Sequence, residues 1–262
     1  MITSLNINND SITGRLGNKL FLVAAMIGLA ERYNDKVLLP HWQYGDIFNN
    51  IPTSKLEMIQ SSVNVRYREP HFHYTKIPYK QGTNMDLFGY FQSEQYFDHC
   101  REQIKFYFNP NADVLNKVQD KWDDIRSTVK VKEENIVLVQ VRTCSDYDND
   151  YHGILPIEYF EKAFKKFPKC KFVMFSDDIE KCKNSFKHHG IHFVDNTDPV
   201  VDLFLSAKCS HAIIPNSTFS WWSAWFIENP QKRIIAPKAW FGPRGRAVNN
   251  TKDLYVSNWE IQ

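Results

Sequence analysis

The sequence predicts an α/β protein with two domains. Its 262 residues are enough for two compact domains. Hydrophobic residues make up 43% of the chain and aromatic residues 15%, a composition typical of folded rather than disordered proteins. Between about residues 130 and 245, short apolar runs alternate four times with helix-patterned segments, which predicts parallel strands joined by right-handed crossovers. We therefore expect a looser α/β domain over 1–129 and a Rossmann-like domain over 130–262.

The first half carries the weaker pattern. A short strand at 2–7 is followed by a helix over 18–33, whose apolar residues recur at helical spacing, and by a strand at 36–40. From there to about residue 85 the chain is aromatic, basic and punctuated by proline, so we expect mostly irregular structure with a short helix at 54–60. A strand and two helices complete this half, at 87–91, 93–108 and 112–125.

The second half alternates regularly. The run "NIVLVQVR" at 135–142 is continuously apolar up to its end, as expected of a buried parallel strand, and the helix after it begins with a proline at 156. Further strands are predicted at 171–177, 191–195, 211–215 and 233–238, and the helices between them at 178–189, 199–209 and 219–228. A parallel sheet flanked by helices follows from this order.

Charge and cysteine content exclude several classes of protein. The net charge of +2 is too small for the broad positive field of a nucleic-acid-binding protein, so any anion must be bound locally. Five widely spaced cysteines without a C-x-x-C pair suggest neither a disulfide framework nor a zinc site. The start of the chain lacks the pattern of a secretory signal, and no apolar segment is long enough to span a membrane. We expect a cytoplasmic protein without an integral membrane segment.

Three predicted strands of the second domain end in side chains suited to an anion. Arg142 ends the first strand, and Ser176 and Asp177 end the second; the segment after the fourth strand contributes Asn216, Ser217, Thr218 and Phe219. Ligands of open parallel sheets bind at the carboxyl ends of the strands, where these residues are expected to converge. Hydroxyl groups at a helix start and a planar guanidinium both suit phosphate oxygens. This arrangement predicts a nucleoside-diphosphate site.

Each of these residues also has a structural interpretation. "NST" before a helix is typical of an N-cap, and Arg142 equally fits an ion pair with Asp146. Asp177 and Asp178 fit the capping of the next helix. The tryptophans that follow Asn216 fit packing between elements better than a sugar platform: Trp221, Trp222 and Trp225.

The first domain contains a second ambiguous loop. In "GRLGNKLF" at 14–21, Gly14 and Gly17 bracket a turn into a helix, and Arg15 and Asn18 are polar. Neither G-x-G-x-x-G nor G-K-[ST] is present, so a dinucleotide or Walker-type loop is not supported. The glycines mark either an ordinary turn or a loop that faces the anion site of the other domain.

Five segments together resemble the α-1,2-fucosyltransferase family. They are "GRLGNKLF" at 14–21, "GYFQSEQYF" at 89–97, "FVMFSDDIEKC" at 172–182, "HAIIPNSTFSWWSAWF" at 211–226 and "IIAPKAWF" at 234–241. They occur in the order of the family and cover nearly the whole chain. The resemblance implies a GT-B fold, with a parallel sheet in each of two Rossmann-like domains and the active site in the cleft between them. It also implies GDP-L-fucose as donor, an inverting reaction without metal or further cofactor, and a glycan hydroxyl as acceptor.

The segment "QVRTCSDY" at 140–147 departs from that family. Most members have His-x-Arg-Arg-x-Asp here, whereas this chain has Gln140 in place of the histidine and Thr143 in place of the second arginine. The spacing is similar to the His-x-Arg-x-Gly-Ser-Asp-Trp pattern of protein O-fucosyltransferases. In that group the single arginine and the loop asparagine are associated with the donor phosphate. The resemblance therefore gives these roles to Arg142 and Asn18.

The resemblance and the chemistry together define a set of candidate residues. Catalytic roles are expected for Arg142, Asn18 and Asp146; donor contacts for Gly14, Arg15, Gly17, Asn18, Arg142, Ser176, Asp177, Asn216, Ser217, Thr218 and Phe219; and acceptor contacts for His41, Trp42 and Glu94. A metal-free site must place positive charge and hydrogen-bond donors where charge grows on the leaving diphosphate. Candidates for a general base are Asp146, Glu94 and Asp177. The resemblance also implies that transfer can proceed with little base assistance.

Two alternatives to a fucosyltransferase stay open. The altered arginine motif also fits the same fold acting on another nucleotide sugar. The loss of the family's histidine and second arginine, at positions 140 and 143, also fits a non-catalytic module that binds a glycan or a nucleotide.

Overall fold

The computed structural model describes residues 1–143, 150–187, 190–195 and 198–262. The chain divides into two compact units: Met1–Ala112 with Asn250–Val256 (unit 1), and Asp113–Asn249 with Ser257–Gln262 (unit 2). The predicted domain limits, 1–129 and 130–262, place the helix before residue 130 in the first domain, whereas it belongs to unit 2 here. Asp146 lies outside the described residues.

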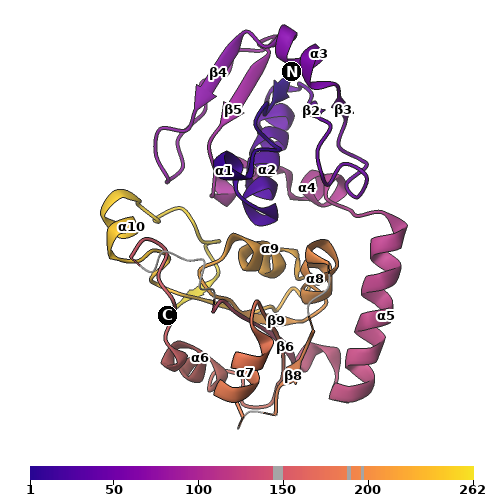
Figure 1. Cartoon of the computed structure of the whole chain (residues 1–262), viewed down its shortest axis with the longest axis vertical. Helices are drawn as coiled ribbons and strands as arrows, with labels where there is room; N and C mark the ends of the chain where they lie inside the picture. Colours follow the sequence, from indigo (N-terminus) through magenta and orange to yellow (C-terminus); the bar gives the residue numbers. More distant parts are fainter. Residues whose placement is uncertain (144–149, 188–189, 196–197) are drawn as a thin grey trace. The chain divides into compact units, whose positions relative to one another are not determined.

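Unit 1 contains a parallel sheet in the order β1-β5-β4 (Figure 1). Its strands are β1 (Ile2–Thr3), β5 (Met85–Phe88) and β4 (Val65–Arg68), and a parallel pair beside them comprises β2 (Leu39–Pro40) and β3 (Thr53–Ser54). A parallel bridge between Ile2 and Val37 joins the two sets. The helices are α1 (Asp10–Thr13), α2 (Leu16–Tyr33), α3 (Leu56–Ser62) and α4 (Arg101–Tyr107).

Helix α2 is the centre of unit 1. Its residues are buried almost continuously from Leu16 to Ala30, so the helix is apolar on every side, as expected of a core helix. Gly28 allows close packing, because a Cβ atom there would lie 2.1 Å from the Tyr96 carbonyl oxygen. The helix ends at Asn34, which adopts a left-handed conformation and donates its backbone N–H to Ala30 and Glu31. The predicted helix over 18–33 is thus confirmed.

One expectation for unit 1 is incomplete and another is wrong. The segment from residue 41 to about residue 85 is mostly irregular and contains one short helix, α3, as expected. It also contains β4, which pairs with the whole length of β5. The alternating, largely exposed sequence "VRYR" hides this strand, because its charged side chains conceal the apolar signal. The single helix expected over 93–108 is instead two 3-10 turns (Glu94–Tyr96 and Asp98–Cys100) followed by α4. Phe97 interrupts the helix with a φ of −143° and a ψ of 9°, which are not helical values.

Unit 2 is a six-stranded parallel sheet in the order β11-β10-β9-β6-β7-β8. Its strands are β6 (Ile136–Val141), β7 (Lys171–Ser176), β8 (His192–Phe193), β9 (His211–Ile213), β10 (Ile234–Ala236) and β11 (Glu260–Ile261). Its helices are α5 (Ala112–Val129, apart from its first residue), α6 (Ile157–Phe164), α7 (Ile179–Ser185), α8 (Pro199–Ser206), α9 (Thr218–Phe226) and α10 (Pro243–Val248), with a 3-10 turn at Glu133–Asn135. The alternation predicted for the second half is confirmed.

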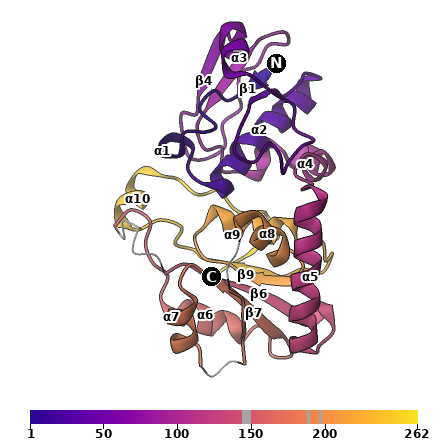
Figure 2. The ribbon, with the colours of Figure 1, turned by 45° about the vertical axis from the view of Figure 1, so that its right-hand side comes forward.

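The helices of unit 2 cover both faces of the sheet. Helices α6 and α7 lie on one face, and α8 and α9 lie on the other (Figures 1 and 2). Val137, Val139 and Val141 of β6 belong to the core on the α6–α7 side, together with Phe160 and Phe164. The alternate residue Gln140 bonds to side chains of α8 and α9. The middle strand β6 is therefore buried on both faces, which explains its continuous apolar run.

Candidate functional site

Arg142 follows the central strand β6 of unit 2, and its guanidinium is paired with Asp177. The Arg142 Nε atom lies 3.5 Å from Asp177 Oδ2, and each side chain is 19% exposed. Asp177 Oδ1 also accepts hydrogen bonds from the backbone N–H of Thr143 (2.8 Å) and from its hydroxyl group (3.1 Å). The carboxylate thus binds both residues that follow β6. The structure brings Arg142 and Asp177 together at adjacent strand ends, as the sequence predicts.

The two aspartates after β7 have different roles. Asp178 caps α7, since its side chain accepts the backbone N–H of Lys181 at 3.0 Å. Asp177 instead turns toward Thr143 and Arg142. Ser176 lies between them: its hydroxyl accepts the Asp178 N–H at 3.1 Å and donates to Asp177 at 3.4 Å. The capping interpretation therefore holds for Asp178, and Asp177 orients the arginine.

Asn216 follows β9, the strand next to β6, and is only 6% exposed. Its amide nitrogen donates to three backbone carbonyls, those of His152 (2.8 Å), Gly153 (3.1 Å) and Trp240 (3.0 Å). The side chain therefore ties two neighbouring loops to the start of α9. Contact between Asn216 and the nucleotide-sugar donor stays a prediction. The amide N–H groups of Asn216 already form hydrogen bonds within the protein.

The residues after Asn216 begin helix α9. Ser217 occupies the N-cap position, yet within the described part of the chain its side chain makes no capping hydrogen bond. Thr218 and Phe219 form the first turn and are partly exposed. Trp221, Trp222 and Trp225 are at most 2% exposed, so the interpretation as packing residues is confirmed. The helix start thus retains a hydroxyl side chain that capping does not use.

Gln140 occupies the position at which the resembling family has histidine. It is 4% exposed, and its amide nitrogen donates to Ser206 Oγ of α8 (3.1 Å) and Ser223 Oγ of α9 (3.2 Å). Among the described residues, its amide oxygen has no hydrogen-bond partner. The departure from the family motif is thus a buried link between β6 and the two helices on one face of the sheet.

The loop 14–18 of unit 1 is shaped by Gly14 and Asn18. Gly14 has a φ of +71°, and a Cβ atom there would lie 2.3 Å from the Asn18 Nδ2 atom. The glycine is therefore required both for the turn and for the position of the amide. Asn18 Oδ1 accepts a hydrogen bond from Gln92 Nε2 at 3.1 Å. Arg15 is exposed at the N-cap position of α2, and Gly17 is buried within its first turn.

Glu69 holds the turn that carries Gln92. Its carboxylate accepts the backbone N–H of Tyr90 at 2.7 Å and that of Phe91 at 3.0 Å. Burial raises the pKa of Glu69 to about 7, although these two hydrogen bonds lower it. Phe91 has a φ of +51°, an unusual conformation for an aromatic residue, and the carboxylate stabilises it. Sequence analysis missed Glu69, because nothing in "YREPHF" marks this acidic residue.

Two residues predicted to contact the acceptor form contacts with other side chains of unit 1. Trp42 is 7% exposed and stacks on Phe48, with ring centroids 6.1 Å apart. Glu94 forms an ion pair with Arg101. The acceptor roles of Trp42 and Glu94, and that of Glu94 as base, stay predictions. The third predicted residue, His41, lines a hollow.

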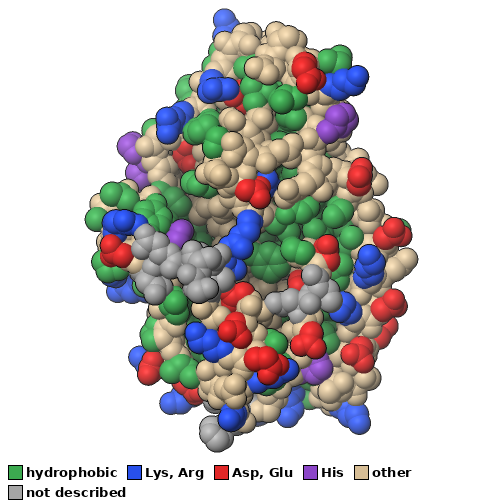
Figure 3. All heavy atoms as spheres, viewed as in Figure 1, with side chains coloured by type: hydrophobic (Ala, Val, Ile, Leu, Met, Phe, Trp, Pro, Cys, Tyr) green, Lys and Arg blue, Asp and Glu red, His purple; other side chains and the backbone are tan. Residues whose placement is uncertain are grey.

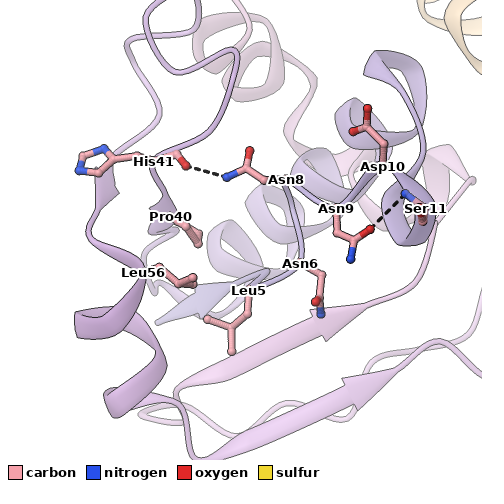
Figure 4. Close-up of a pocket in the computed structure, with 9 residues that line it drawn as sticks. All are labelled: Leu5, Asn6, Asn8, Asn9, Asp10, Ser11, Pro40, His41 and Leu56. Carbon is pink, nitrogen blue, oxygen red and sulfur yellow. Dashed lines mark hydrogen bonds between the residues drawn. The ribbon is translucent and has the colours of Figure 1, made fainter.

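This hollow has a volume of about 740 Å³ and lies within unit 1 (Figure 4). It is lined by Leu5, Asn6, Asn8, Asn9, Asp10, Ser11, Pro40, His41 and Leu56. The His41 carbonyl accepts from Asn8 Nδ2 at 2.7 Å, and its imidazole points away from Asn8 (Figure 4). The ring is instead within 3.1 Å of the Thr53 hydroxyl group.

Neither a cluster of metal ligands nor a membrane-spanning helix is found among the described residues. No group of three or more His, Cys, Asp or Glu side chains in the described ranges could hold a metal ion. No described helix is long and apolar enough to cross a membrane. On the face drawn in Figure 3, basic and acidic side chains are interspersed, without a broad region of one sign.

Parallel sheets covered by helices are typical of Rossmann-type α/β proteins, whose ligands bind at the carboxyl ends of the strands. The model of Glycosyl transferase family 11 matches residues 3–261, and the chain belongs to this family. The resemblance noted in the sequence is thereby confirmed.

Similar proteins occur in a bacterium and in an animal. The chain is 31% identical over 185 residues to the O-antigen biosynthesis glycosyltransferase WbnK of Escherichia coli, covering 66% of this chain and 59% of that protein. It is 30% identical over 173 residues to an α-1,2-colitosyltransferase of Escherichia coli, covering 60% and 57%. The matches thus span less than three fifths of these relatives. The putative galactoside 2-α-L-fucosyltransferase svh-11 of Caenorhabditis elegans is 22% identical over 249 residues, covering 84% and 68%.

Solved structures bear on the fold. A crystal structure of POFUT1 in complex with GDP superposes with a TM-score of 0.51 at 10% identity, covering 89% of this chain and 97% of that one. The fucosyltransferase NodZ from Bradyrhizobium gives a TM-score of 0.48 at 12% identity, covering 85% and 90%. The fold is GT-B, as expected. The predicted location of the active site between the domains stays a prediction.

Proposed function

We propose that the chain is an inverting glycosyltransferase that transfers L-fucose from GDP-L-fucose to a glycan hydroxyl group, forming an α-1,2 linkage. The observation that carries this proposal is the pairing of Arg142 with Asp177 at the ends of β6 and β7, in a chain matched by family 11 almost from end to end. The names of two relatives, an α-1,2-colitosyltransferase and a putative 2-α-L-fucosyltransferase, support the linkage.

The proposed chemistry assigns a charge-stabilising role to Arg142. Breaking the bond between the sugar and the diphosphate builds negative charge on the leaving oxygen, which a fixed cation stabilises without reorganisation. The guanidinium can bind two phosphate oxygens at once. Asp177 holds it through Nε and also fixes the Thr143 backbone, so the arginine is oriented before the donor binds. Neither role requires a metal.

In this proposal, the start of α9 supplies a second group of hydrogen-bond donors to the phosphate oxygens. The backbone N–H groups of the first turn of a helix carry partial positive charge and favour anions. The hydroxyl groups of Ser217 and Thr218 stand at this helix start, after the strand adjacent to β6. That solved structures of the same fold were crystallised with GDP is consistent with a diphosphate here.

A second candidate donor is a colitosyl nucleotide. It is favoured by the 30% identity to an α-1,2-colitosyltransferase and by the altered motif at Gln140 and Thr143. The donor choice does not alter the role of Arg142, which would contact the diphosphate common to both.

The test is a donor panel. Thermal unfolding would be followed with GDP, GDP-fucose, GDP-mannose, GDP-colitose and UDP-glucose, and donor hydrolysis would be measured for those that stabilise the protein. We expect stabilisation by GDP and GDP-fucose, and turnover that Arg142→Ala lowers by about 10²- to 10³-fold while the protein stays folded. Stabilisation by UDP-glucose alone would reject the proposed donor, and GDP binding without turnover with any acceptor would favour the non-catalytic module. Product linkage analysis would then test the α-1,2 assignment.

We also propose a cytoplasmic location. In support, Cys100, Cys170, Cys182 and Cys209 are free thiols, as expected for a protein of a reducing compartment. Fractionation followed by thiol labelling of the native protein would test this.

A further inference from the structure

The hollow of unit 1 lies at the carboxyl ends of two parallel strands, β1 and β2. Asn6, Asn8 and Asn9 belong to the segment that follows β1, and His41 directly follows β2. Both strands run in the same direction, as the Ile2–Val37 bridge shows. The carboxyl ends of parallel strands are the usual location of ligand sites in open α/β sheets. The position of the hollow in the fold therefore indicates a binding site.

The lining of the hollow has an apolar side and an amide side. Leu5, Pro40 and Leu56 make up the apolar side, and Asn6, Asn8 and Asn9 the amide side (Figure 4). A pyranose ring has the same duality, because its C–H groups form an apolar face and its hydroxyl groups both donate and accept. Side-chain amides match hydroxyl groups in both capacities. The nine described lining residues include neither lysine nor arginine, and Asp10 is acidic, so a neutral ligand fits better than an anion.

The amide side is held in place by a buried lysine. Lys19 of α2 is 0% exposed; its ammonium group donates to the Ile7 carbonyl at 2.6 Å and pairs with Asp10 Oδ1 at 2.8 Å. A buried ammonium group is costly unless it is paired and hydrogen-bonded, and Lys19 meets this need by binding both ends of the segment from Ile7 to Asp10. Asn8 is fixed further by its bond to the His41 carbonyl, and Asn9 by accepting the Ser11 N–H at 3.1 Å. The wall of the hollow is thus largely preformed.

We propose that this hollow binds a neutral, hydroxyl-rich pyranose unit of the acceptor glycan. The proposal rests on the proposed transferase function. Lys19 directly follows Asn18 in α2, so the helix that carries the predicted phosphate loop also anchors the wall of the hollow. The proposal assigns binding to the side-chain amides and to Leu5, Pro40 and Leu56. The acceptor contact expected of His41 is assigned to the amide of Asn8 instead, because the His41 imidazole points away from Asn8 (Figure 4).

Direct binding tests the proposal without transfer. Amide NMR spectra of the full chain would be titrated with methyl β-galactoside, methyl β-glucoside and methyl β-N-acetylglucosaminide, and with methyl β-galacturonide as the anionic counterpart of the first. We expect a neutral glycoside to shift the amide signals of residues 5–11 and of His41, and the galacturonide to bind at least tenfold more weakly. Absence of such shifts with every neutral glycoside, or stronger binding of the galacturonide, would overturn the proposal.

Kinetics separate this site from the donor site. Asn8→Ala and Asn6→Ala should each raise KM for the acceptor about tenfold, with KM for the donor unchanged, because one hydrogen-bonding amide is worth about that factor. Asn50→Ala is the matched control, since Asn50 also donates to a backbone carbonyl, that of Phe106 at 2.7 Å, but does not line the hollow. A raised donor KM in Asn8→Ala, or equal effects in Asn50→Ala, would overturn the proposal. Absence of turnover in the wild type would count against the proposed function alone, because the titration still decides where a glycoside binds.

Discussion

The strand-end clusters of the two units are built differently. In unit 2, Arg142, Thr143 and Asp177 follow two long adjacent strands and are joined by direct side-chain contacts. In unit 1, Asn18, Gln92 and Glu69 come from three distant segments, and backbone amides join two of them. The first cluster uses a charge pair to orient a cation, and the second uses a carboxylate to shape a turn. The comparison indicates that unit 2 supplies the charge of its strand-end cluster, whereas unit 1 supplies the shape of a loop.

Replacing the cation should have the largest effect on activity. We expect Arg142→Ala to lower kcat by about 10²- to 10³-fold, since one preorganised donor to a developing charge contributes that much. The melting temperature should change little, because the pair with Asp177 spans 3.5 Å and Asp177 keeps its two hydrogen bonds to Thr143 in the variant. Steady-state kinetics and thermal unfolding check both points.

Asp177→Asn distinguishes orientation from charge. It keeps the shape of the side chain, and we expect a smaller loss than in Arg142→Ala. A loss as large as that of Arg142→Ala would give Asp177 a direct role with the substrate. Unchanged kinetics in both variants would contradict the view that unit 2 supplies the charge.

The carboxylate of unit 1 should make stability depend on pH. The pKa of Glu69 is raised from 4.5 to about 7, so between these values the folded protein binds a proton that the unfolded chain releases. The contribution of this group to the free energy of unfolding is therefore greatest below pH 4.5 and falls as pH rises toward 7, by at most about 3 kcal/mol. The charged form thus pays a desolvation cost that its two hydrogen bonds to backbone N–H groups offset only in part.

Comparison of the wild type with Glu69→Gln isolates this group. Urea unfolding at several values between pH 5 and pH 8 should show the wild type losing stability relative to the variant as pH rises. Tyr67 and Tyr96, which face Glu69, have pKa values raised above 10 and stay neutral throughout this range. A constant difference between wild type and Glu69→Gln would show that Glu69 does not titrate here.

The sequence predicts the strand-end cluster of unit 2 better than that of unit 1. Arg142, Ser176 and Asp177 could be found because each terminates a strand whose burial leaves an unbroken apolar run. Strand β4 could not be found, because its charged side chains lie in the solvent and its partner β5 is about 20 residues away. Glu69 was missed for a related reason: it binds backbone amides of Tyr90 and Phe91, and backbone amides leave no mark in a sequence.

The shape of the loop 14–18 can be tested with two glycines of similar conformation. Gly14 and Gly82 have φ values of +71° and +83°, but only at Gly14 would a Cβ atom meet a neighbour, Asn18 Nδ2 at 2.3 Å. Both alanine variants should lose about 1 kcal/mol of stability from backbone strain. Gly14→Ala should in addition displace Asn18 and lower kcat/KM for the donor about tenfold. Equal values of kcat/KM for the donor in the two variants would show that Asn18 does not contribute to donor binding.

The smallest effect is expected at Gln140, where the chain departs most clearly from the histidine of the family motif. Its amide donates to Ser206 and Ser223, but each serine hydroxyl already donates to a carbonyl of its own helix, that of Asp202 or Phe219. The Gln140 amide oxygen has no partner among the described residues, so the buried amide also carries an unmet desolvation cost. Gln140→Leu should therefore change the free energy of unfolding by less than about 1 kcal/mol, as measured by urea unfolding. If Gln140→Leu instead lowers kcat to the level of Arg142→Ala without unfolding the protein, then the buried link through β6 controls the arginine. Unit 2 would then supply shape as well as charge.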